Sequence, residues 1–554
     1  MIYPKIPLAQ SIIEICRAKG ITTIVISPGS RNAPLTLGFS TNTNFECFSI
    51  ADERSAAFFA LGIAQQKKVP IALVCSSGSA LLNYYPAFAE AFYSQIPLIV
   101  ISADRPQSKI DIGDGQTIRQ ENVYANHCLY NANLTEEASV VNDQLICEAI
   151  DTAIQESGPV HINAPFEEPL YETVTALSVS PIVTASAKFT PAITIKELAP
   201  FGDIWNKASK KMILVGVNPP EFVEQAIMDH LATDPSIIVM TETTSNLHHP
   251  TFINNIDTII TPFTATDFED FCPDILLTFG GMIVSKRIKA FLRKYKPTNH
   301  WHIDTLRGYD TFGALTHHFK VCPNVFFNAF MPLVDTKIKS DYFHKMDAIV
   351  QLRKLKTEEY LAQIPFSDFK VFEKVIQSLP KDIQLQVSNS SAIRYAQLID
   401  IDPSIEVFCN RGTSGIDGST STAIGAAVAN KKQTVFITGD IGFLYDSNGL
   451  WNNYIPRNFK IVLINNGGGG IFRILPGHEE TEVFNTFFET AHDLTAAHLA
   501  KMYNMNYHAV ANETDLVALL PAFFENNEKP AILEVFTPTL INDKILLQFF
   551  KELI

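Results

Sequence analysis

Short β-branched apolar runs alternate with helix-like segments along most of this chain. In the first third, apolar runs at 22–26, 71–75, 98–102 and 160–163 alternate with helical patterns at 8–19, 55–66 and 80–94. Continuous apolar runs are typical of strands that are buried on both faces, and strands that alternate with helices form parallel sheets. The sequence therefore predicts an α/β fold of doubly wound parallel sheets.

The same alternation starts again twice further along the chain. A second unit opens with the apolar run at 211–216 and leads into a long charged helix at 342–363. A third unit starts near residue 368 and ends in a strand at 531–536. The stretch 174–192 is rich in Ser, Thr, Val and Ala, which is typical of a linker. Because 554 residues exceed what one hydrophobic core supports, we expect three α/β domains, at 1–175, 190–345 and 365–554.

Composition excludes several classes of function. With 43 basic and 58 acidic residues, the chain has a formal net charge of −15, which argues against a nucleic-acid partner. No apolar run reaches the roughly 18 to 20 residues that a membrane-spanning helix needs. The N-terminus resembles neither a signal peptide nor a transit peptide, so we expect a cytoplasmic protein. The eight cysteines are scattered without a C-x-x-C pair, and a zinc site is not expected.

The most specific motif lies in the third unit, at the ends of two strand-like runs. The pair Gly439-Asp440 follows one apolar run, and Asn465-Asn466 follows the next run and precedes four glycines. Neighbouring parallel strands would bring the carboxylate and the carboxamide to the same edge of a sheet. Oxygen ligands suit Mg²⁺, and glycines allow backbone amides to approach phosphate. The motif therefore predicts a site for Mg²⁺ and a diphosphate.

Other strand ends carry polar loops as well. They are the segments 27–34, 51–54, 75–79, 102–106 with 115–120, 281–287, 388–394 and 410–418. Several of these loops hold an arginine, whose planar guanidinium suits carboxylates, so we expect them to bind small anions. Each loop taken alone also has a simpler interpretation, as a tight strand-to-helix turn or a solvated arginine. Glu53, taken alone, is better explained as an acidic residue favoured at the N-terminus of a helix.

Taken together, these segments resemble those of thiamine-diphosphate-dependent enzymes. The Asp440–Asn466 motif resembles their diphosphate–Mg²⁺ motif, and Glu53 stands where they keep the glutamate that activates the cofactor. The finer pattern is similar to the 2-succinyl-5-enolpyruvyl-6-hydroxy-3-cyclohexene-1-carboxylate synthases of menaquinone biosynthesis. The matching segments, in chain order, are SPGSR at 27–31, DERSAAFFALG at 52–62, SADRP at 102–106, QTIRQ at 116–120, CNRGTSGIDG at 409–418, GDIGFLYDSNGL at 439–450 and NNGGGGIF at 465–472.

The resemblance implies a role for each matching residue. The expected catalytic residue is Glu53, as the partner of the aminopyrimidine, and the expected metal ligands are Asp440, Asn466 and the backbone carbonyl of Gly468. Cofactor contacts are expected from Pro28, Glu53, Ser390, Ile416, Gly439, Asp440, Asn466, Ile471 and Phe472, with Ile416 as the apolar wedge that bends the cofactor. Substrate contacts are expected from Ser30, Arg31, Arg105, Gln116, Lys286, Arg287, Arg394 and Arg411. Ile441 stands where the superfamily usually has a third glycine, a departure that this subgroup tolerates.

The same resemblance implies the reaction and the assembly. Thiamine diphosphate with Mg²⁺, or with Mn²⁺ in its place, would serve the decarboxylation of 2-oxoglutarate and the 1,4-addition of the succinyl unit to isochorismate. A homodimer or tetramer with active sites between the chains is implied as well. One alternative is another thiamine-diphosphate 2-oxo acid decarboxylase or acetolactate-type synthase. A catalytically silent cofactor-binding protein is disfavoured because Glu53, Asp440 and Asn466 are all present. A nicotinamide-binding enzyme is disfavoured because no G-x-G-x-x-G follows an early strand.

Overall fold

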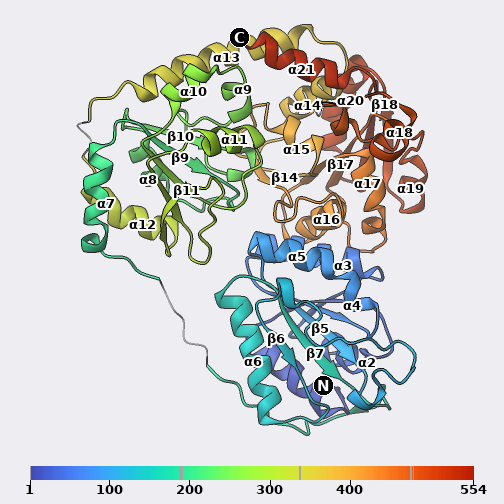
Figure 1. The fold of residues 1–554 in the computed structure, drawn as a ribbon. Helices are drawn as coiled ribbons and strands as arrows, with labels where there is room; N and C mark the ends of the chain where they lie inside the picture. The colour runs from blue at the N-terminus through green and yellow to red at the C-terminus, as the bar shows by residue number, and fades with distance from the viewer. Residues whose placement is uncertain (1, 186–190, 336–337, 475–476, 478) are drawn as a thin grey trace.

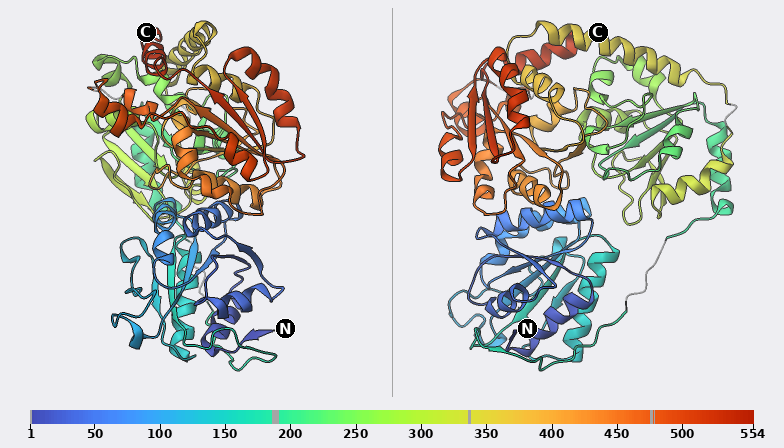
Figure 2. Two further views of the ribbon diagram at one scale, coloured as in Figure 1. Left: turned by 90° about the vertical axis from the view of Figure 1, so that its right-hand side faces the viewer. Right: turned by 180° about the vertical axis from the view of Figure 1, so that it is seen from behind.

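The structure is a computed structural model that describes residues 2–185, 191–335, 338–474, 477 and 479–554. Within these residues, three parallel sheets are flanked by helices, which confirms the doubly wound α/β fold class. Figures 1 and 2 show the N-terminal unit packed beneath the C-terminal unit, with the middle unit beside the C-terminal unit. Helix α13 (Tyr342–Gln363) runs across the top from the middle unit to the C-terminal unit.

The N-terminal unit is built on a six-stranded parallel sheet of order β3-β2-β4-β5-β7-β6. Its strands are β2 (Thr23–Ile26), β3 (Glu46–Ser49), β4 (Ile71–Cys75), β5 (Leu98–Asp104), β6 (Asn131–Asn133) and β7 (Val160–Pro165). Its helices are α1 (Pro7–Ala18), α2 (Ala33–Ser40), α3 (Glu53–Lys67), α4 (Ala80–Asn83), α5 (Tyr85–Ser94) and α6 (Val140–Gln155), with short 3₁₀ turns η1 (Gln107–Lys109) and η2 (Ala125–His127). A small antiparallel pair, β1 (Tyr3–Pro4) with β8 (Thr173–Val174), joins the two ends of the unit.

The middle unit is built on a five-stranded parallel sheet of order β10-β9-β11-β12-β13. Its strands are β9 (Lys211–Val215), β10 (Ile237–Thr241), β11 (Ile275–Phe279), β12 (Asn299–Ile303) and β13 (Leu315–Phe319). Its helices are α7 (Ile195–Lys207), α8 (Gln225–Leu231), α9 (Ile256–Ile260), α10 (Ala265–Phe271), α11 (Lys286–Lys294) and α12 (Pro323–Phe330), with 3₁₀ turns η3 (Thr243–Ser245) and η4 (Met331–Leu333).

The C-terminal unit is built on a six-stranded parallel sheet of order β15-β14-β16-β17-β19-β18. Its strands are β14 (Gln384–Val387), β15 (Glu406–Phe408), β16 (Thr434–Gly439), β17 (Phe459–Asn465), β18 (Asn506–Val510) and β19 (Ala531–Phe536). Its longer helices are α14 (Asp368–Gln377), α15 (Ser391–Ala396), α16 (Ser419–Ala429), α17 (Asp440–Tyr445), α19 (Ala497–Met502), α20 (Glu513–Glu525) and α21 (Asn542–Glu552). Shorter elements are η5 (Ser447–Leu450), η6 (Gly470–Ile474), α18 (Glu482–Phe484) and the π-helical turn η7 (Asn485–Glu489).

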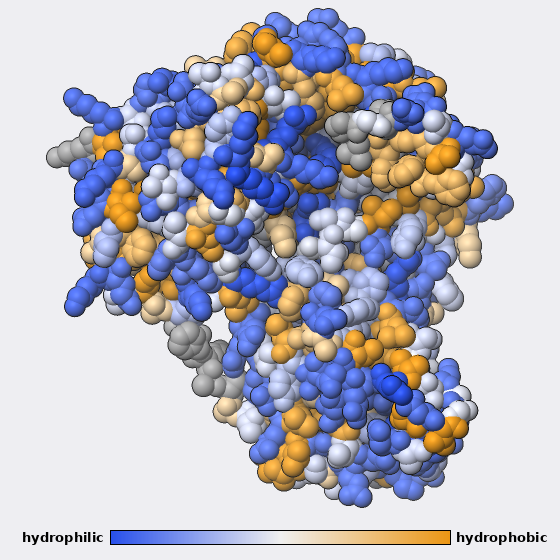
Figure 3. Space-filling model, viewed as in Figure 1, coloured by the Kyte–Doolittle hydropathy of each residue, from blue (hydrophilic) through white to orange (hydrophobic). Residues whose placement is uncertain are grey.

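The apolar runs are buried as their composition requires. Strands β4, β9 and β17 are buried along their whole length, because helices cover both faces of each sheet. On the face shown in Figure 3, hydrophobic residues occur in scattered groups among hydrophilic ones. None of the described helices is both long and apolar enough to cross a membrane.

One apolar core joins the N-terminal and C-terminal units. It contains residues of α3 and β4 together with residues of α16, β16 and β17. Helices α3 and α16 approach each other so closely that glycine is required on both. A Cβ on Gly62 would lie 2.1 Å from the carbonyl oxygen of Thr422, and a Cβ on Gly425 would lie 2.0 Å from that of Phe59. The two helices therefore pack backbone against backbone.

A buried carboxyl group lies at the same junction. The Asp446 side chain is fully buried and accepts hydrogen bonds from the Ser421 backbone N–H at 2.7 Å and the Ser421 hydroxyl at 3.1 Å. The nearest cation is Arg54 of α3, whose guanidinium lies 3.9 Å away. Burial raises the pKa of Asp446 to about 7, against the lowering effects of Ser421 and Arg54.

The helix contact predicts that Gly62→Ala destabilises the protein. A methyl group there meets a backbone oxygen that cannot rotate away, and overpacking of this kind costs about 1–3 kcal/mol. The gain in helix propensity from Gly to Ala, about 1 kcal/mol, does not offset a clash with rigid backbone. Thermal or urea unfolding should therefore show a lower stability. Gly115→Ala is the matched control, because nothing lies within 4 Å of its Cβ position; equal stability of both variants would contradict the contact.

The raised pKa of Asp446 predicts a pH-dependent contribution to stability. Because the folded-state pKa of about 7 lies above the ordinary aspartate value of 3.8, folding favours the protonated carboxyl. The stabilisation is complete below the lower value and is lost as the pH rises through the higher one. The melting temperature of the wild type should therefore fall relative to that of Asp446→Asn as the pH rises from about 4 to about 7. A difference that stays constant over this range would contradict the assignment.

Candidate cofactor and substrate site

The motif that the sequence singles out lies at one edge of the C-terminal sheet. Strands β16 and β17 are neighbours in parallel register, with Gly439 opposite Ile464. Asp440 starts helix α17 directly after β16, and Asn465 is the last residue of β17. The carboxylate and the two carboxamides therefore meet at the carboxyl edge of the sheet, where parallel sheets place their ligands.

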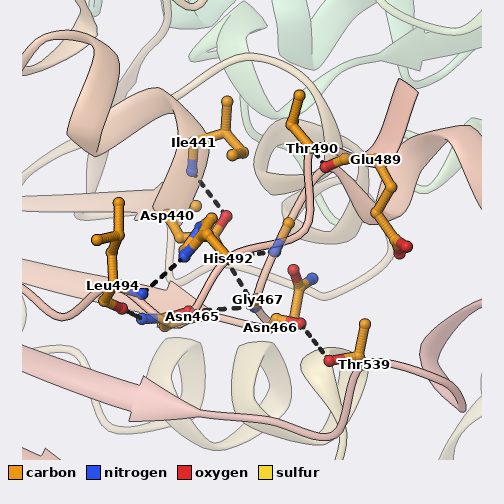
Figure 4. A network of polar contacts seen from close by, with 12 residues as sticks. Asp440, Ile441, Asn465, Asn466, Gly467, Glu489, Thr490, His492, Leu494 and Thr539 are labelled. Carbon is orange, nitrogen blue, oxygen red and sulfur yellow. Dashed lines mark hydrogen bonds and ion pairs between the residues drawn. The ribbon is translucent and has the colours of Figure 1, made fainter. Parts of the chain in front are cut away.

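Asp440 is held by backbone N–H groups of the glycine run (Figure 4). One carboxylate oxygen accepts from Gly467 at 2.9 Å and from Gly468 at 3.0 Å, and the other accepts from Ile441 at 2.7 Å. Gly467 and Gly468 have φ values of 78° and 155°, which glycine adopts without strain. Asp440 is 4% exposed, and burial raises the pKa of its carboxyl group.

The two asparagines of the motif differ in what their side chains do. Asn465 uses its amide internally, donating to the Leu494 carbonyl at 2.9 Å and to Glu534 at 2.7 Å. Asn466 donates to Asp368 at 2.8 Å, but its Oδ1 is buried without a hydrogen-bond partner among the described residues. A buried oxygen without a partner, beside a carboxylate at the same sheet edge, suits a hard cation.

A single carboxylate with amide and carbonyl oxygens is a sparse donor set. Among the described residues, no group of three or more His, Cys, Asp or Glu side chains could hold a metal ion. Asp440 and Asn466 could supply two of the several oxygens that Mg²⁺ needs, and a diphosphate and water would have to supply others. This edge therefore fits a metal that arrives with a phosphate-bearing ligand.

A segment after the glycine run folds back over the motif, and the sequence gives no local signal for it. Glu489 is buried and paired with Arg473 through both nitrogens of the guanidinium edge. Its backbone carbonyl accepts from the Gly469 N–H at 2.6 Å. The His492 Nε2 lies 3.5 Å from an Asp440 oxygen, and the His492 N–H donates to the Gly467 carbonyl at 3.0 Å. The segment thus holds the glycine run in place through backbone hydrogen bonds of Glu489 and His492 (Figure 4).

The apolar candidates of the C-terminal unit lie beside this edge. Ile416 is half-buried, and its Cβ lies 3.8 Å from the position of a Cβ on Gly442, the third residue of α17. Ser390 adopts a φ of 69° at the start of α15. Ile471 and Phe472 are half-buried in η6, where the Phe472 ring meets the Phe488 ring edge to face at 6.1 Å.

The structure brings cations of the middle and C-terminal units into one electrostatic cluster. Burial and the neighbouring Arg411 lower the pKa of Arg394, which also interacts with the carboxylates Asp257 and Glu242. The Arg394 side chain has no hydrogen bond to any described residue. Arg411 donates to Asn389 at 2.7 Å, and its Nε is buried without a partner among the described residues. Lys286 and Arg287 are exposed at the start of α11, and Arg287 lies over the Phe550 ring at 4.6 Å.

Three further members of this cluster are absent from the sequence-based set. Lys289, one turn along α11, is half-buried, and burial lowers its pKa. Glu242 is 4% exposed and accepts from the Val284 and Ser285 N–H groups, each at 2.7 Å, just before α11 begins. Burial raises the pKa of Glu242 to about 7. Asp257 accepts a hydrogen bond from the Ser285 hydroxyl. Only the spacing of Lys289 three residues after Lys286 could have suggested any of them.

The candidates of the N-terminal unit gather at the edge of their own sheet. Pro28 and Ser30 are exposed after β2, whereas Arg31 is 3% exposed and donates to the Phe166 carbonyl at 3.0 Å and to Glu168 at 3.1 Å. Arg31 is therefore engaged within its own unit.

Two other candidates lie on the loop after β5. Arg105 lies 3.9 Å from Asp114. Gln116 is exposed and has a φ of 55°. Its backbone carbonyl accepts a hydrogen bond from the Ser77 hydroxyl at 2.9 Å. Arg105 is half-buried, whereas Gln116 is open to solvent.

Glu53 is the first residue of α3 and is only half-buried in the single chain. Its carboxylate accepts from the Asn83 amide at 3.3 Å, while Asp52 caps the helix by accepting from the Ser55 N–H at 3.0 Å. Among the described residues, no hydrogen bond or ion pair joins Glu53 to Asp440 or Asn466. The two halves of the expected cofactor site are thus not connected by direct polar contacts within one chain.

Comparison with known proteins defines the class. Residues 6–125 match the N-terminal TPP binding domain of thiamine pyrophosphate enzymes, and residues 390–535 match the C-terminal TPP binding domain. Thiamine pyrophosphate is thiamine diphosphate, and these are the two units that carry Glu53 and Asp440. The molecule is a thiamine-diphosphate-dependent enzyme, which confirms the predicted cofactor.

Full-length relatives narrow the class further. A 2-succinyl-5-enolpyruvyl-6-hydroxy-3-cyclohexene-1-carboxylate synthase of Flavobacterium johnsoniae is 68% identical over 554 residues, covering 100% of both chains. The synthase of the same name from Flavobacterium psychrophilum is 66% identical over 100% of both chains. The one from Christiangramia forsetii is 51% identical over 100% of this chain and 99% of its own. The chain belongs to this family of synthases, as its motifs predict.

Proposed function

We propose that this enzyme decarboxylates 2-oxoglutarate on thiamine diphosphate and adds the resulting succinyl unit 1,4 to isochorismate. The product is 2-succinyl-5-enolpyruvyl-6-hydroxy-3-cyclohexene-1-carboxylate, the compound named by the relatives. The observation that carries the proposal is the cation cluster of Arg394, Arg411 and α11, which lies between two units of an otherwise acidic chain. Local positive charge suits two anionic substrates.

We assign the metal to the carboxyl edge of the C-terminal sheet. Asp440, the Oδ1 of Asn466 and the carbonyl of Gly468 would hold Mg²⁺, or Mn²⁺ in its place, together with the cofactor diphosphate. The buried Asn466 oxygen without a hydrogen-bond partner supports this assignment. Gly439, Ser390, Pro28 and the apolar side chains Ile416, Ile471 and Phe472 complete the proposed cofactor contacts, with Ile416 as the wedge beneath the bend of the cofactor.

The proposed chemistry divides between the cofactor and the chain. When bound, thiamine diphosphate supplies the electron sink for the electron pair that the broken C–C bond leaves behind when CO₂ departs. Glu53 would hold a proton at N1′ of the aminopyrimidine and so control the protonation of the 4′-amino group. The half-buried position of Glu53 at the start of a helix suits this role once the cofactor covers the carboxylate.

The proposed substrate contacts come from all three units. Ser30, Arg31, Arg105 and Gln116 form one set in the N-terminal unit, and Lys286, Arg287, Arg394 and Arg411 form the other. Lys289 joins the second set because it lies in the same electrostatic cluster. These cations would bind carboxylates and fix the approach of the two substrates, because orientation supplies much of the rate in a two-substrate reaction.

We further propose that the active site forms between two copies of the chain, in a homodimer or a tetramer. The lack of a direct polar contact between Glu53 and the Asp440 edge in one chain supports this. Leu82 and Tyr445, which flank the contacts of Glu53 and Arg54, expose 43% and 54% of their surface, as expected for side chains that a partner covers. A cytoplasmic location stays part of the proposal.

The test is an assay with thiamine diphosphate, Mg²⁺, 2-oxoglutarate and isochorismate, in which each component is omitted in turn. Product should form only with all four. Glu53→Gln keeps the shape but cannot exchange the proton, so its turnover should fall about 10²- to 10⁴-fold. Wild-type turnover in this variant would overturn the assigned role. Release of a free aldehyde without an adduct of isochorismate would indicate a decarboxylase instead.

A second measurement tests the metal assignment without turnover. Asn466→Ala removes the buried oxygen and should weaken Mg²⁺ binding, titrated by calorimetry in the presence of thiamine diphosphate, by about ten-fold or more. The matched control is Asn458→Ala, which alters an amide at the opposite end of the same strand, β17. Unchanged Mg²⁺ affinity in Asn466→Ala would remove this residue from the ligand set.

A further inference from the structure

A buried turn of the middle unit contacts the start of α11, which carries Lys286, Arg287 and Lys289, and the strand that precedes Arg411. The turn comprises residues 242–246, which follow β10 and contain η3. At its first residue, the Glu242 carboxylate accepts the N–H groups of Val284 and Ser285 and thereby holds the start of α11. Lys286, Arg287 and Lys289 follow within one helical turn, so this end of the turn fixes the middle unit's cations.

The last residue of the turn reaches the C-terminal unit. The Asn246 side-chain amide donates to the Val407 carbonyl at 2.9 Å, and its Oδ1 accepts from the Val407 N–H at 2.8 Å. Val407 is the middle residue of β15, which lies at the edge of its sheet. The amide thus pairs with the outward-facing backbone of this edge strand as another strand would. Four residues after Val407 comes Arg411, so this end of the turn fixes the segment that leads into Arg411.

The turn itself is rigidly held. The Ser245 hydroxyl donates to the Val215 carbonyl at 2.8 Å and accepts from the Glu242 N–H at 2.8 Å. The Asn246 amide also donates to the Asn218 carbonyl at 2.8 Å. Thr244 and Ser245 are fully buried. A displacement at either end would break these bonds, so the turn acts as a spacer of fixed length.

We propose that Asn246 is a positioning residue that sets the separation between the α11 cations and Arg411, and thereby the affinity of the cluster for an anionic substrate. The inference rests on the proposed function, because the ligand of the cluster is taken to be a substrate carboxylate. It goes beyond that function by assigning the geometry of the substrate site to a residue that touches no substrate.

The same interface offers a contact that only joins the two units. The Asn254 amide donates to Asp400 at 3.2 Å across the interface, where both residues are exposed and Asn255 also donates to Asp400 at 2.7 Å. Loss of this contact should affect the attachment of the units without moving the cations. Asn254→Ala is therefore the matched control for Asn246.

The test variant is Asn246→Gly. Asn246 has φ 48° and ψ 36°, a left-handed conformation that glycine adopts without strain, so the substitution removes the amide clamp and leaves the backbone path intact. In the assembled enzyme with thiamine diphosphate and Mg²⁺, KM should rise about ten-fold or more for at least one anionic substrate, because a shift of about 1 Å costs up to 10²-fold. The affinity for thiamine diphosphate should not change, and Asn254→Ala should leave both KM values unchanged.

Unchanged KM values in a folded Asn246→Gly variant would overturn the inference, even if its melting temperature fell. Calorimetry with 2-oxoglutarate alone measures binding without turnover. An inactive wild-type enzyme would contradict the proposed function. The inference would still be tested by comparing the 2-oxoglutarate dissociation constants of the wild type and Asn246→Gly. If the variant does not fold, hydrogen exchange of the wild-type protein decides. Added 2-oxoglutarate should slow exchange in residues 284–289 and 406–411 together, and slowing in only one segment would overturn the coupling.

Discussion

The backbone contact between α3 and α16 is the constraint on which the arrangement of this molecule depends. Two glycines allow the helices to meet without intervening side chains, and the surrounding core belongs to both terminal units at once. A shared core of this kind leaves little freedom for rotation of one unit against the other. Glu53 is the first residue of α3, and Asp446 lies at the same junction, directly after α17. The contact between α3 and α16 therefore also fixes the positions of Glu53 and of α17.

The two units joined in this way have the same topology. Numbered from the first strand of each sheet, both follow the order 2-1-3-4-6-5, and the middle sheet follows the related order 2-1-3-4-5. The carboxyl edge of one terminal sheet carries Glu53 and the arginine loops, and that of the other carries the Asp440 motif. The topological repeat is invisible in the sequence, because apolar strands and helices of many compositions satisfy the same packing rules.

Regular patterns made much of the fold predictable, and long-range contacts explain what was missed. The charged stretch at 342–363 is one helix, α13, with those bounds, and the Asp440–Asn466 pair lies at one sheet edge because parallel register requires it. The helix expected over 80–94 is instead α4 and α5, separated at Tyr84 just before Pro86. Only the fold shows that Asn466, and not Asn465, has a side-chain oxygen free for a ligand, because the partners of Asn465 come from segments remote in the sequence. Glu242 and Asp257 were missed for the same reason.

The charges of the cluster explain why an acidic chain can concentrate arginines at one point. Arg287, Lys289, Arg394 and Arg411 interact with two carboxyl groups, the buried Glu242 and the half-buried Asp257. Without a carboxylate nearby, the mutual repulsion of these cations in a partly buried site would be costly. Glu242 and Asp257 offset only part of this positive charge, because burial raises the pKa of both carboxyl groups, and a net positive charge suits an anionic ligand. The two carboxyl groups therefore reduce the repulsion between the cations and still leave the positive charge that the proposed anionic substrates require.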